Sequence, residues 1–281
     1  MNSFDHFTPA TLPDALALLA ERDGDAAIIA GGTDLLLRMK HGIVKPRAVV
    51  NIKRIPDLHG ISSDSDSGLR IGALTTLREL TRSPQILDLY PVLAQTAGVM
   101  ASEQIRSLAT LGGNLCNASP SADLAPPLIA LDAEACLVSL SGERRIPLAD
   151  FFTGPGKSVM QRGELLKAII LPAPKGKTVY LKHSPRACMD IAIVGAAVRV
   201  YKNGSACHQA RIALGAVAPT PLRVRSGEEI LEGQTVSAER IQQAAKTSAE
   251  SCSPISDVRG AAWYRKRMVA VLVRRGIEMT L

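Results

Sequence analysis

Aromatic side chains are scarce in this sequence, and their scarcity excludes a function that the charge alone would suggest. Phe, Trp and Tyr make up 3% of the 281 residues, too few for the stacking surfaces of proteins that bind single-stranded nucleic acid. The formal net charge is +7, but the basic residues are spread along the chain. The sequence also lacks any run of eighteen apolar residues, so no membrane-spanning helix is predicted.

Cysteines are few and follow no metal-binding spacing. No C-x-x-C occurs, so neither a zinc site nor an iron–sulfur cluster is predicted from spacing. An odd number of scattered cysteines is typical of a reducing compartment, and we expect each to be a small buried hydrophobe. The first residues lack the basic region of a secretory signal peptide, so we expect a cytoplasmic protein. The five cysteines are Cys116, Cys136, Cys188, Cys207 and Cys252.

The common nucleotide and catalytic motifs are missing as well. There is no G-x-G-x-x-G, and "GPGKS" at 154–158 fails as a P-loop because Phe151 stands where that motif needs glycine. The five histidines show no metal-ligand spacing, so no metal ligand is predicted. A Ser–His or Cys–His nucleophile stays open, but nothing points to one, and we predict no catalytic side chain.

The first part of the chain alternates between helical and extended patterns. A chain of this length with 46% hydrophobic residues can bury a sizeable core and is expected to form two domains. Apolar spacing predicts helices at 12–22, from about 35 to Gly42, and at 77–83, 91–102 and 125–133. Short apolar runs predict strands at 26–30, 47–52, 68–74, 134–140 and 164–171.

A boundary is predicted at "PAPKGK", residues 172–177, where two prolines and a glycine separate apolar runs. We therefore expect domains at 1–175 and 176–281. Asn203-Gly204 between two apolar runs predicts a hairpin, and helices are expected near 226–232, 237–251 and 258–276. An antiparallel hairpin followed by helices predicts a small α+β domain.

The densest basic run lies in the last predicted helix, between Tyr264 and Gly276. Its apolar residues recur at helical spacing, so we expect a helix packed on its domain with a basic, exposed side. An acidic partner or an anionic ligand is the alternative. The basic residues are Arg265, Lys266, Arg267, Arg274 and Arg275.

The first glycine segment is "AGGTDLL", residues 30–36. A predicted strand ends there, Gly31 and Gly32 let the backbone turn, and Thr33 lies where a helix begins. Bare backbone N–H groups at the start of a helix suit an anion. The alternative is a tight turn in which Thr33 or Asp34 merely caps the helix.

The second glycine segment is "TLGGNLCNASPSAD", residues 110–123. We interpret Gly112-Gly113 as a second loop with bare backbone, in which Thr110, Asn114 and Ser119 offer side-chain hydrogen bonds. Asp123 could accept hydrogen bonds from a sugar hydroxyl. The alternative is an irregular polar loop before the next helix. One diphosphate could use both segments.

These two segments resemble those of the FAD-binding subunit of the molybdenum hydroxylases, the xanthine dehydrogenase and carbon monoxide dehydrogenase family. The resemblance covers nearly the whole chain. It implies an α+β fold: a two-part FAD-binding domain of the vanillyl-alcohol-oxidase/PCMH type, then a small domain with an antiparallel sheet and helices. Some members carry an extra iron–sulfur cluster in an insertion here; "CNASPSADL" is uninterrupted, so we expect none.

The resemblance also implies roles for particular residues around FAD. The first segment would surround the pyrophosphate, chiefly through backbone groups; the second would complete that site. Asp123 would bind hydroxyls of the adenosine part, Leu166 would contact the flavin and Lys182 would lie near the cofactor. The implied cofactor-binding residues are Ile28, Ile29, Ala30, Gly31, Gly32, Thr33, Asp34, Leu35, Thr110, Leu111, Gly112, Gly113, Asn114, Asp123, Leu166 and Lys182.

The function implied is electron transfer inside a larger enzyme. Iron–sulfur clusters and molybdopterin would sit on a small and a large partner subunit, in a dimer of heterotrimers. FAD on this chain would pass electrons to NAD, oxygen or a quinone. Two alternatives stay open: a stand-alone FAD-dependent oxidoreductase, and a scaffold subunit without flavin.

Overall fold

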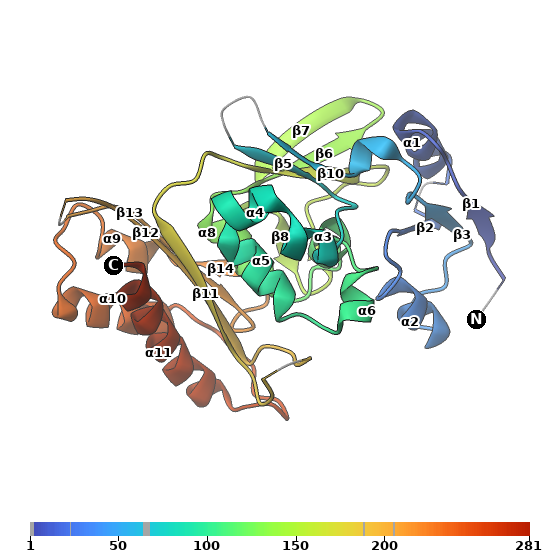
Figure 1. The fold of residues 1–281 in the computed structure, drawn as a ribbon. Coiled ribbons are helices and arrows are strands. Elements are labelled where there is room, and N and C mark those ends of the chain that lie inside the picture. The colour runs from blue at the N-terminus through green and yellow to red at the C-terminus, as the bar shows by residue number, and fades with distance from the viewer. Residues whose placement is uncertain (1–2, 23, 64–67, 188, 205) are drawn as a thin grey trace.

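The computed structural model describes residues 3–22, 24–63, 68–187, 189–204 and 206–281. The fold is α+β, with a small parallel sheet near the N-terminus, a central antiparallel sheet with short helices, and a C-terminal antiparallel sheet backed by two long helices (Figure 1). The helices α4, α5 and α8 lie between the central and C-terminal sheets in this view.

The N-terminal sheet is parallel, with strand order β1-β3-β2. Helix α1 begins where the Thr11 side chain accepts a hydrogen bond from the backbone of Asp14, and its apolar face packs on β3. The elements are β1 (Asp5–Phe7), α1 (Leu12–Glu21), β2 (Ala26–Ile29), α2 (Leu35–Lys40) and β3 (Ala48–Asn51).

The central sheet has the order β4-β5-β10-β6-β7 and is antiparallel throughout. Its central strand β10 buries six of seven residues, because it is flanked by β5 and β6 and contributes side chains to the largest hydrophobic cluster and to two smaller ones. Its strands are β4 (Ile61–Ser63), β5 (Leu69–Gly72), β6 (Glu134–Ser139), β7 (Gly142–Pro147) and β10 (Leu165–Leu171).

Short helices fill the space beside this sheet. A reciprocal capping box between Thr76 and Glu79 begins α3, and Pro91 at the first position begins α5. The elements are η1 (Pro56–Leu58), α3 (Leu77–Arg82), α4 (Pro84–Leu89), α5 (Pro91–Gly98), α6 (Glu103–Arg106), α7 (Leu111–Cys116), α8 (Ala125–Ala130), η2 (Leu148–Asp150), β8 (Phe152–Gly154) and β9 (Lys157–Ser158).

The C-terminal sheet, order β11-β12-β13-β14, is covered on both faces. Ala197 and Ala213 belong to the cluster around α8, whereas Val198 and Ile212 belong to the cluster around α10 and α11. Small alanines therefore face α8. The elements are β11 (Lys177–His183), β12 (Val194–Asn203), β13 (Ala206–Gly215), β14 (Leu222–Arg223), α9 (Arg225–Glu229), α10 (Ala238–Glu250) and α11 (Ala262–Thr280).

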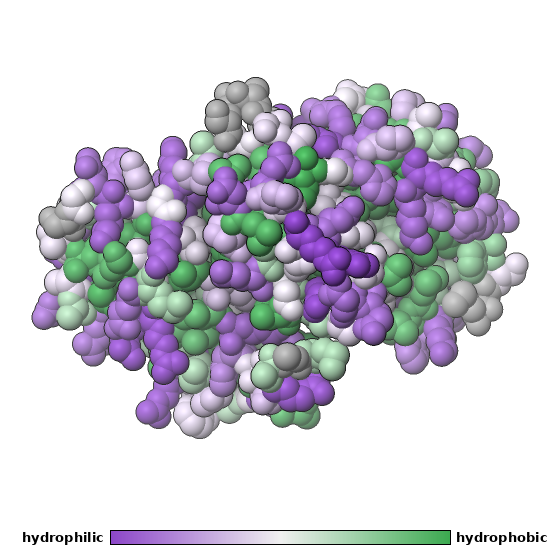
Figure 2. Space-filling view, viewed as in Figure 1, coloured by the Kyte–Doolittle hydropathy of each residue, from purple (hydrophilic) through white to green (hydrophobic). Residues whose placement is uncertain are grey.

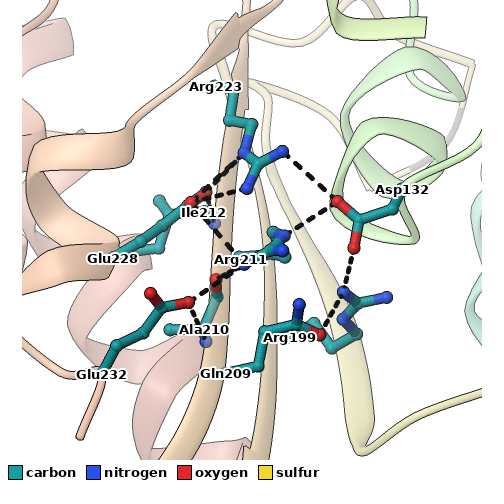
Figure 3. A network of polar contacts seen from close by, with 9 residues as sticks. All are labelled: Asp132, Arg199, Gln209, Ala210, Arg211, Ile212, Arg223, Glu228 and Glu232. Carbon is teal, nitrogen blue, oxygen red and sulfur yellow. Dashed lines mark hydrogen bonds and ion pairs between the residues drawn. The ribbon is translucent and has the colours of Figure 1, made fainter. Parts of the chain in front are cut away.

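A network of charged side chains joins α8 to this sheet (Figure 3). Asp132, directly after α8, accepts hydrogen bonds from Arg211 at 2.8 Å and Arg223 at 3.3 Å, and from Arg199. These three arginines come from β13, β14 and β12. Burial alone would raise the pKa of Asp132, but the hydrogen bond of Arg211 and the charges of Arg199 and Arg211 outweigh it and lower the pKa below its ordinary value.

Most predicted elements are confirmed, including the hairpin of β12 and β13 and the three C-terminal helices. The sequence analysis missed several strands, all of which are edge strands of their sheets: β1, β4, β7, β8, β9, β11 and β14. Edge strands bury few side chains, so their apolar alternation is weak; every residue of β7 is exposed or half-exposed. The interpretation of 110–116 as a loop was wrong, because these residues cap and form α7.

The expectation of a basic, exposed side on the last helix was wrong at Arg265. This guanidinium is 2% exposed and donates to the carbonyls of Ile193 and Ala216, at 3.1 and 3.0 Å, and to Asp257 at 2.6 Å. It therefore ties the helix to the ends of β12 and β13. The other four basic residues of that run are exposed.

The surface mixes hydrophilic and hydrophobic side chains. Figure 2 shows green side chains gathered over α2, where Leu36, Leu37 and Ile43 are exposed. None of the helices in the described part of the chain is both long and apolar enough to span a membrane. Within the same residues, no group of three or more His, Cys, Asp or Glu could hold a metal ion.

Candidate functional site

Both glycine segments line one cavity of about 600 Å³. Cofactor sites commonly have volumes of about 300–1,000 Å³, so this cavity is large enough for one. Its walls come from the turn after β2, from α7, from the segment before α8 and from β10. The predicted site residues that line it are Ile28, Ala30, Gly31, Gly32, Thr33, Asp34, Leu35, Thr110, Gly112, Gly113, Asn114, Asp123 and Leu166.

Three predicted site residues do not line the cavity. Ile29 packs with Met39 and is 8% exposed, and Leu111 is 1% exposed in the central core. Lys182 does not line the cavity; its ammonium contacts Asp123 instead. The structure thus brings thirteen of the sixteen predicted residues to the cavity and sets these three outside it.

The first glycine segment has the geometry expected of it. Gly32 has φ +78°, which a side chain would strain. The backbone of Gly31 lies so close to that of Leu108 that a Cβ on residue 31 would overlap the Leu108 carbonyl oxygen. Among the described residues, the backbone N–H groups of 31–35 donate no hydrogen bond. These five amides have no partner within the described part of the chain, and their residues line the cavity.

The second glycine segment does not offer bare amides, and that interpretation was wrong. The N–H of Gly112 donates to the Ala73 carbonyl at 2.8 Å, and that of Gly113 to the Thr110 hydroxyl at 3.0 Å. A Cβ on Gly112 would lie 2.7 Å from that of Ala73. Gly112 therefore serves the close packing of α7 against the chain after β5.

Asn114 is the polar group of this helix that is left without a partner. Its side-chain Oδ1 is buried and has no hydrogen-bond partner, although Asn114 lines the cavity. A buried acceptor without a partner costs about 1–3 kcal/mol, so native structures contain few of them. A donor on a molecule in the cavity would satisfy it.

Asp123 is the buried charge of the cavity wall, 7% exposed. Its Oδ1 accepts a hydrogen bond from the Tyr180 hydroxyl at 2.7 Å, and its Oδ2 accepts one from the Lys182 ammonium at 2.9 Å. Both partners come from β11, an element that the sequence analysis did not expect. No signal in the sequence marked Tyr180, because it is a single aromatic residue on an edge strand.

The two segments also contact each other. The Asn117 amide donates to the Asp34 carboxylate at 3.2 Å across 83 positions of sequence. Apolar lining that the sequence analysis did not single out includes Ile52, Leu74 and Leu77. Their apolar runs were assigned to strands and helices, and only the fold shows which of these side chains reach the cavity.

One expectation about the cysteines was wrong. Cys136, Cys207 and Cys252 are buried, but Cys116 is exposed and lines the cavity beside Met160, whose Sδ lies 3.6 Å from its Sγ. Cys188 lies outside the described residues. These four described cysteines are free thiols.

The titratable groups of the cavity do not form an acid–base pair. Asp190 is bonded to Arg186, and the Arg186 hydrogen bond, which outweighs a small effect of burial, lowers the pKa of Asp190 below its ordinary value. Asp34 accepts a hydrogen bond from Asn117, and Asp123 forms an ion pair with Lys182. The arrangement suits binding of a large polar cofactor rather than proton transfer by a side chain.

Two family models match the chain. Residues 2–174 match the family model described as "FAD binding domain in molybdopterin dehydrogenase", and residues 179–280 match "CO dehydrogenase flavoprotein C-terminal domain". The putative xanthine dehydrogenase FAD-binding subunit XdhB of Escherichia coli is 33% identical, over 96% of this chain and 93% of the relative. The carbon monoxide dehydrogenase medium chain of Hydrogenophaga pseudoflava is 34% identical, over 98% and 96%.

Solved structures show the same fold. A chain of carbon monoxide dehydrogenase from Hydrogenophaga pseudoflava superposes with a TM-score of 0.95 at 33% identity, covering 99% of this chain and 97% of that one. A chain of quinoline 2-oxidoreductase from Pseudomonas putida gives 0.93 at 28% identity, with the same coverage.

Proposed function

This chain belongs to the FAD-binding medium subunits of the molybdenum hydroxylase family, and we propose that it is the electron-transfer subunit of a multi-subunit enzyme. When bound, FAD would supply two-electron redox chemistry between iron–sulfur clusters of a partner and an external acceptor such as NAD, oxygen or a quinone. The chain's own residues would bind and orient the cofactor.

The residues of the cavity fit FAD. The five unused amides of 31–35 suit a pyrophosphate, because bare N–H groups at a glycine turn bind anions. The unpaired Asn114 oxygen needs a donor, and Asp123 can accept from a hydroxyl. The observation that carries the proposal is this set of unused donors and acceptors around one cavity.

The assignment of roles follows the cavity walls. We propose that 28–35 holds the pyrophosphate, that Thr110 to Asn114 forms the opposite wall, and that Asp123 binds hydroxyls of the adenosine part. Leu166 on β10 would contact the flavin. Lys182 would act through Asp123, which it neutralises at 2.9 Å.

The two-domain division is part of the proposal. We propose an FAD-binding domain at 1–175 and a C-terminal domain at 176–281. The first family match ends at residue 174 and the second begins at residue 179, which supports a boundary between β10 and β11.

We propose two partners, a small iron–sulfur subunit and a large molybdopterin subunit, in a dimer of heterotrimers. The described titratable groups that line the cavity form no acid–base pair, which supports chemistry on another subunit. The free thiols of the described cysteines support a cytoplasmic location.

Two measurements test this function. Purified alone, the chain is expected to retain about one flavin, released as FAD on denaturation, and to hydroxylate no organic substrate. Co-expressed with the two subunits, it is expected to co-purify with molybdenum and iron. Hydroxylation by the isolated, metal-free chain would favour a stand-alone oxidoreductase, and a chain that never binds flavin would favour a scaffold.

A further inference from the structure

We infer that Tyr180 is a positioning residue of the cofactor site: its hydroxyl, together with the Lys182 ammonium, fixes the Asp123 carboxylate for a hydroxyl donor in the cavity. The inference rests on the proposed FAD function and adds a residue of the C-terminal sheet to it. The flavin site is then complete only when that sheet is docked.

The sheet presents both side chains to the same carboxylate. Tyr180 and Lys182 are two positions apart on β11, so they point to the same face. Tyr180 packs against the hydrophobic cluster around α8, while Val179 and Leu181 pack against the cluster on the opposite face. The alternation of β11 thus sets the hydroxyl and the ammonium against the segment before α8.

The opposite strand leaves room for this arrangement. Gly195 on β12 pairs with Lys182, and a Cβ there would overlap the Tyr180 hydroxyl. The hydroxyl is therefore confined between Gly195 and Asp123. Burial, and then the charge of Asp123, raise the pKa of Tyr180 well above its ordinary value, so the phenol stays protonated and remains a donor.

Asp123 keeps acceptor capacity after both contacts. A carboxylate can accept about four hydrogen bonds, and Tyr180 and Lys182 use one on each oxygen. Because Asp123 lines the cavity, its remaining lone pairs can accept hydrogen bonds from a ligand there. Because both oxygens are held, the carboxylate rotates less, and a hydroxyl of the ligand meets an acceptor that is already oriented.

The experiment is a double-mutant cycle on the full chain, stripped of flavin and titrated with FAD by fluorescence quenching. Tyr180→Phe removes only the hydroxyl and is expected to raise the Kd for FAD about tenfold. This is slightly less than the loss of a hydrogen bond to a charged group would cause. In the Asp123→Ala background, which has no side-chain acceptor for the Tyr180 hydroxyl, Tyr180→Phe is expected to change the Kd by less than about twofold, because its effect passes through Asp123. Additive effects in the cycle would overturn the inference.

Tyr201→Phe is the matched control. Tyr201 lies on β12 of the same sheet, 37% exposed and outside the cavity lining, so its Kd is expected to equal that of the wild type. The melting temperature of each variant separates loss of folding from loss of positioning, and Lys182→Met perturbs the same carboxylate should Tyr180→Phe misfold.

The outcomes distinguish the two proposals. A wild-type chain that binds no FAD contradicts the proposed function. A wild-type chain that binds FAD as tightly as its Tyr180→Phe variant contradicts only the inference about Tyr180.

Discussion

At the scale of single residues, the cofactor site combines a stable fold with polar groups that the fold leaves unused. Asn114 carries a buried oxygen without a partner. A buried polar atom of this kind lowers stability, so its presence is explained by a ligand rather than by folding. Function and stability should therefore respond in opposite directions when it is replaced.

Asn114→Leu tests that separation. The variant replaces an unsatisfied polar group by an apolar one of similar size, so the free energy of unfolding is expected to stay equal or to rise by about 1 kcal/mol. FAD retention is expected to fall markedly. Urea denaturation of the flavin-free chain and the flavin content after gel filtration measure the two effects. A variant that loses stability but retains flavin would show that Asn114 belongs to the fold alone.

At the scale of elements, the two glycine segments have different structural roles. The first is a turn whose glycines permit a left-handed backbone and a close approach to the chain near Leu108. The second is a short helix whose N-terminal amides are satisfied by Ala73, Thr75 and the Thr110 cap. The two segments therefore have similar composition but different backbone structures, a turn in the first and a short helix in the second.

Gly31→Ala should be costly for folding. Its Cβ would overlap a backbone oxygen, which cannot rotate away, so the free energy of unfolding is expected to fall by about 3 kcal/mol, at the upper end for overpacking. Gly98→Ala is the control, since a Cβ there meets nothing within 4 Å, and this change is expected to be neutral or slightly stabilising. Denaturant unfolding of both variants checks this; equal stabilities would contradict the packing argument.

At the scale of the whole molecule, α8 is held to the C-terminal sheet at both ends. Asp123 before the helix contacts β11, and Asp132 after it contacts β12, β13 and β14. Arg223 and Arg211 are held in turn by Glu228 at 2.9 Å and Glu232 at 3.0 Å. Both parts of the chain are thereby joined by charge as well as by the alanines that face α8.

Asp132→Asn should weaken this junction in a pH-dependent way. It leaves Arg199, whose side chain is 3% exposed, without its anion, so the free energy of unfolding at pH 7 is expected to fall by about 3 kcal/mol. The lowered pKa of Asp132 means that its contribution is present above the unfolded pKa of about 3.9 and is lost as pH falls through the folded pKa.

The measurement is chemical denaturation from pH 7 down to the acid transition. The wild type is expected to lose stability below about pH 4 with a steeper slope than Asp132→Asn, which keeps only the contributions of the other carboxylates. Asp88→Asn, an exposed site on α4, serves as the control and is expected to follow the wild-type slope. Parallel slopes in all three proteins would show that Asp132 does not titrate with folding.

The sequence by itself determined the positions of most elements, the glycine turn after β2 and the class of cofactor, because these depend on local spacing, on backbone freedom and on segments that are characteristic of a family. The tertiary structure decided what those segments contact. The amides of α7 are satisfied by Ala73 and Thr75, and Asp123 is held by residues 57 and 59 positions later. Arg265 is buried, although the sequence pattern predicts a basic, exposed side for its helix. Local patterns record which face of an element is apolar, but the partners of a buried polar group are set by segments that meet only when the sheets pack.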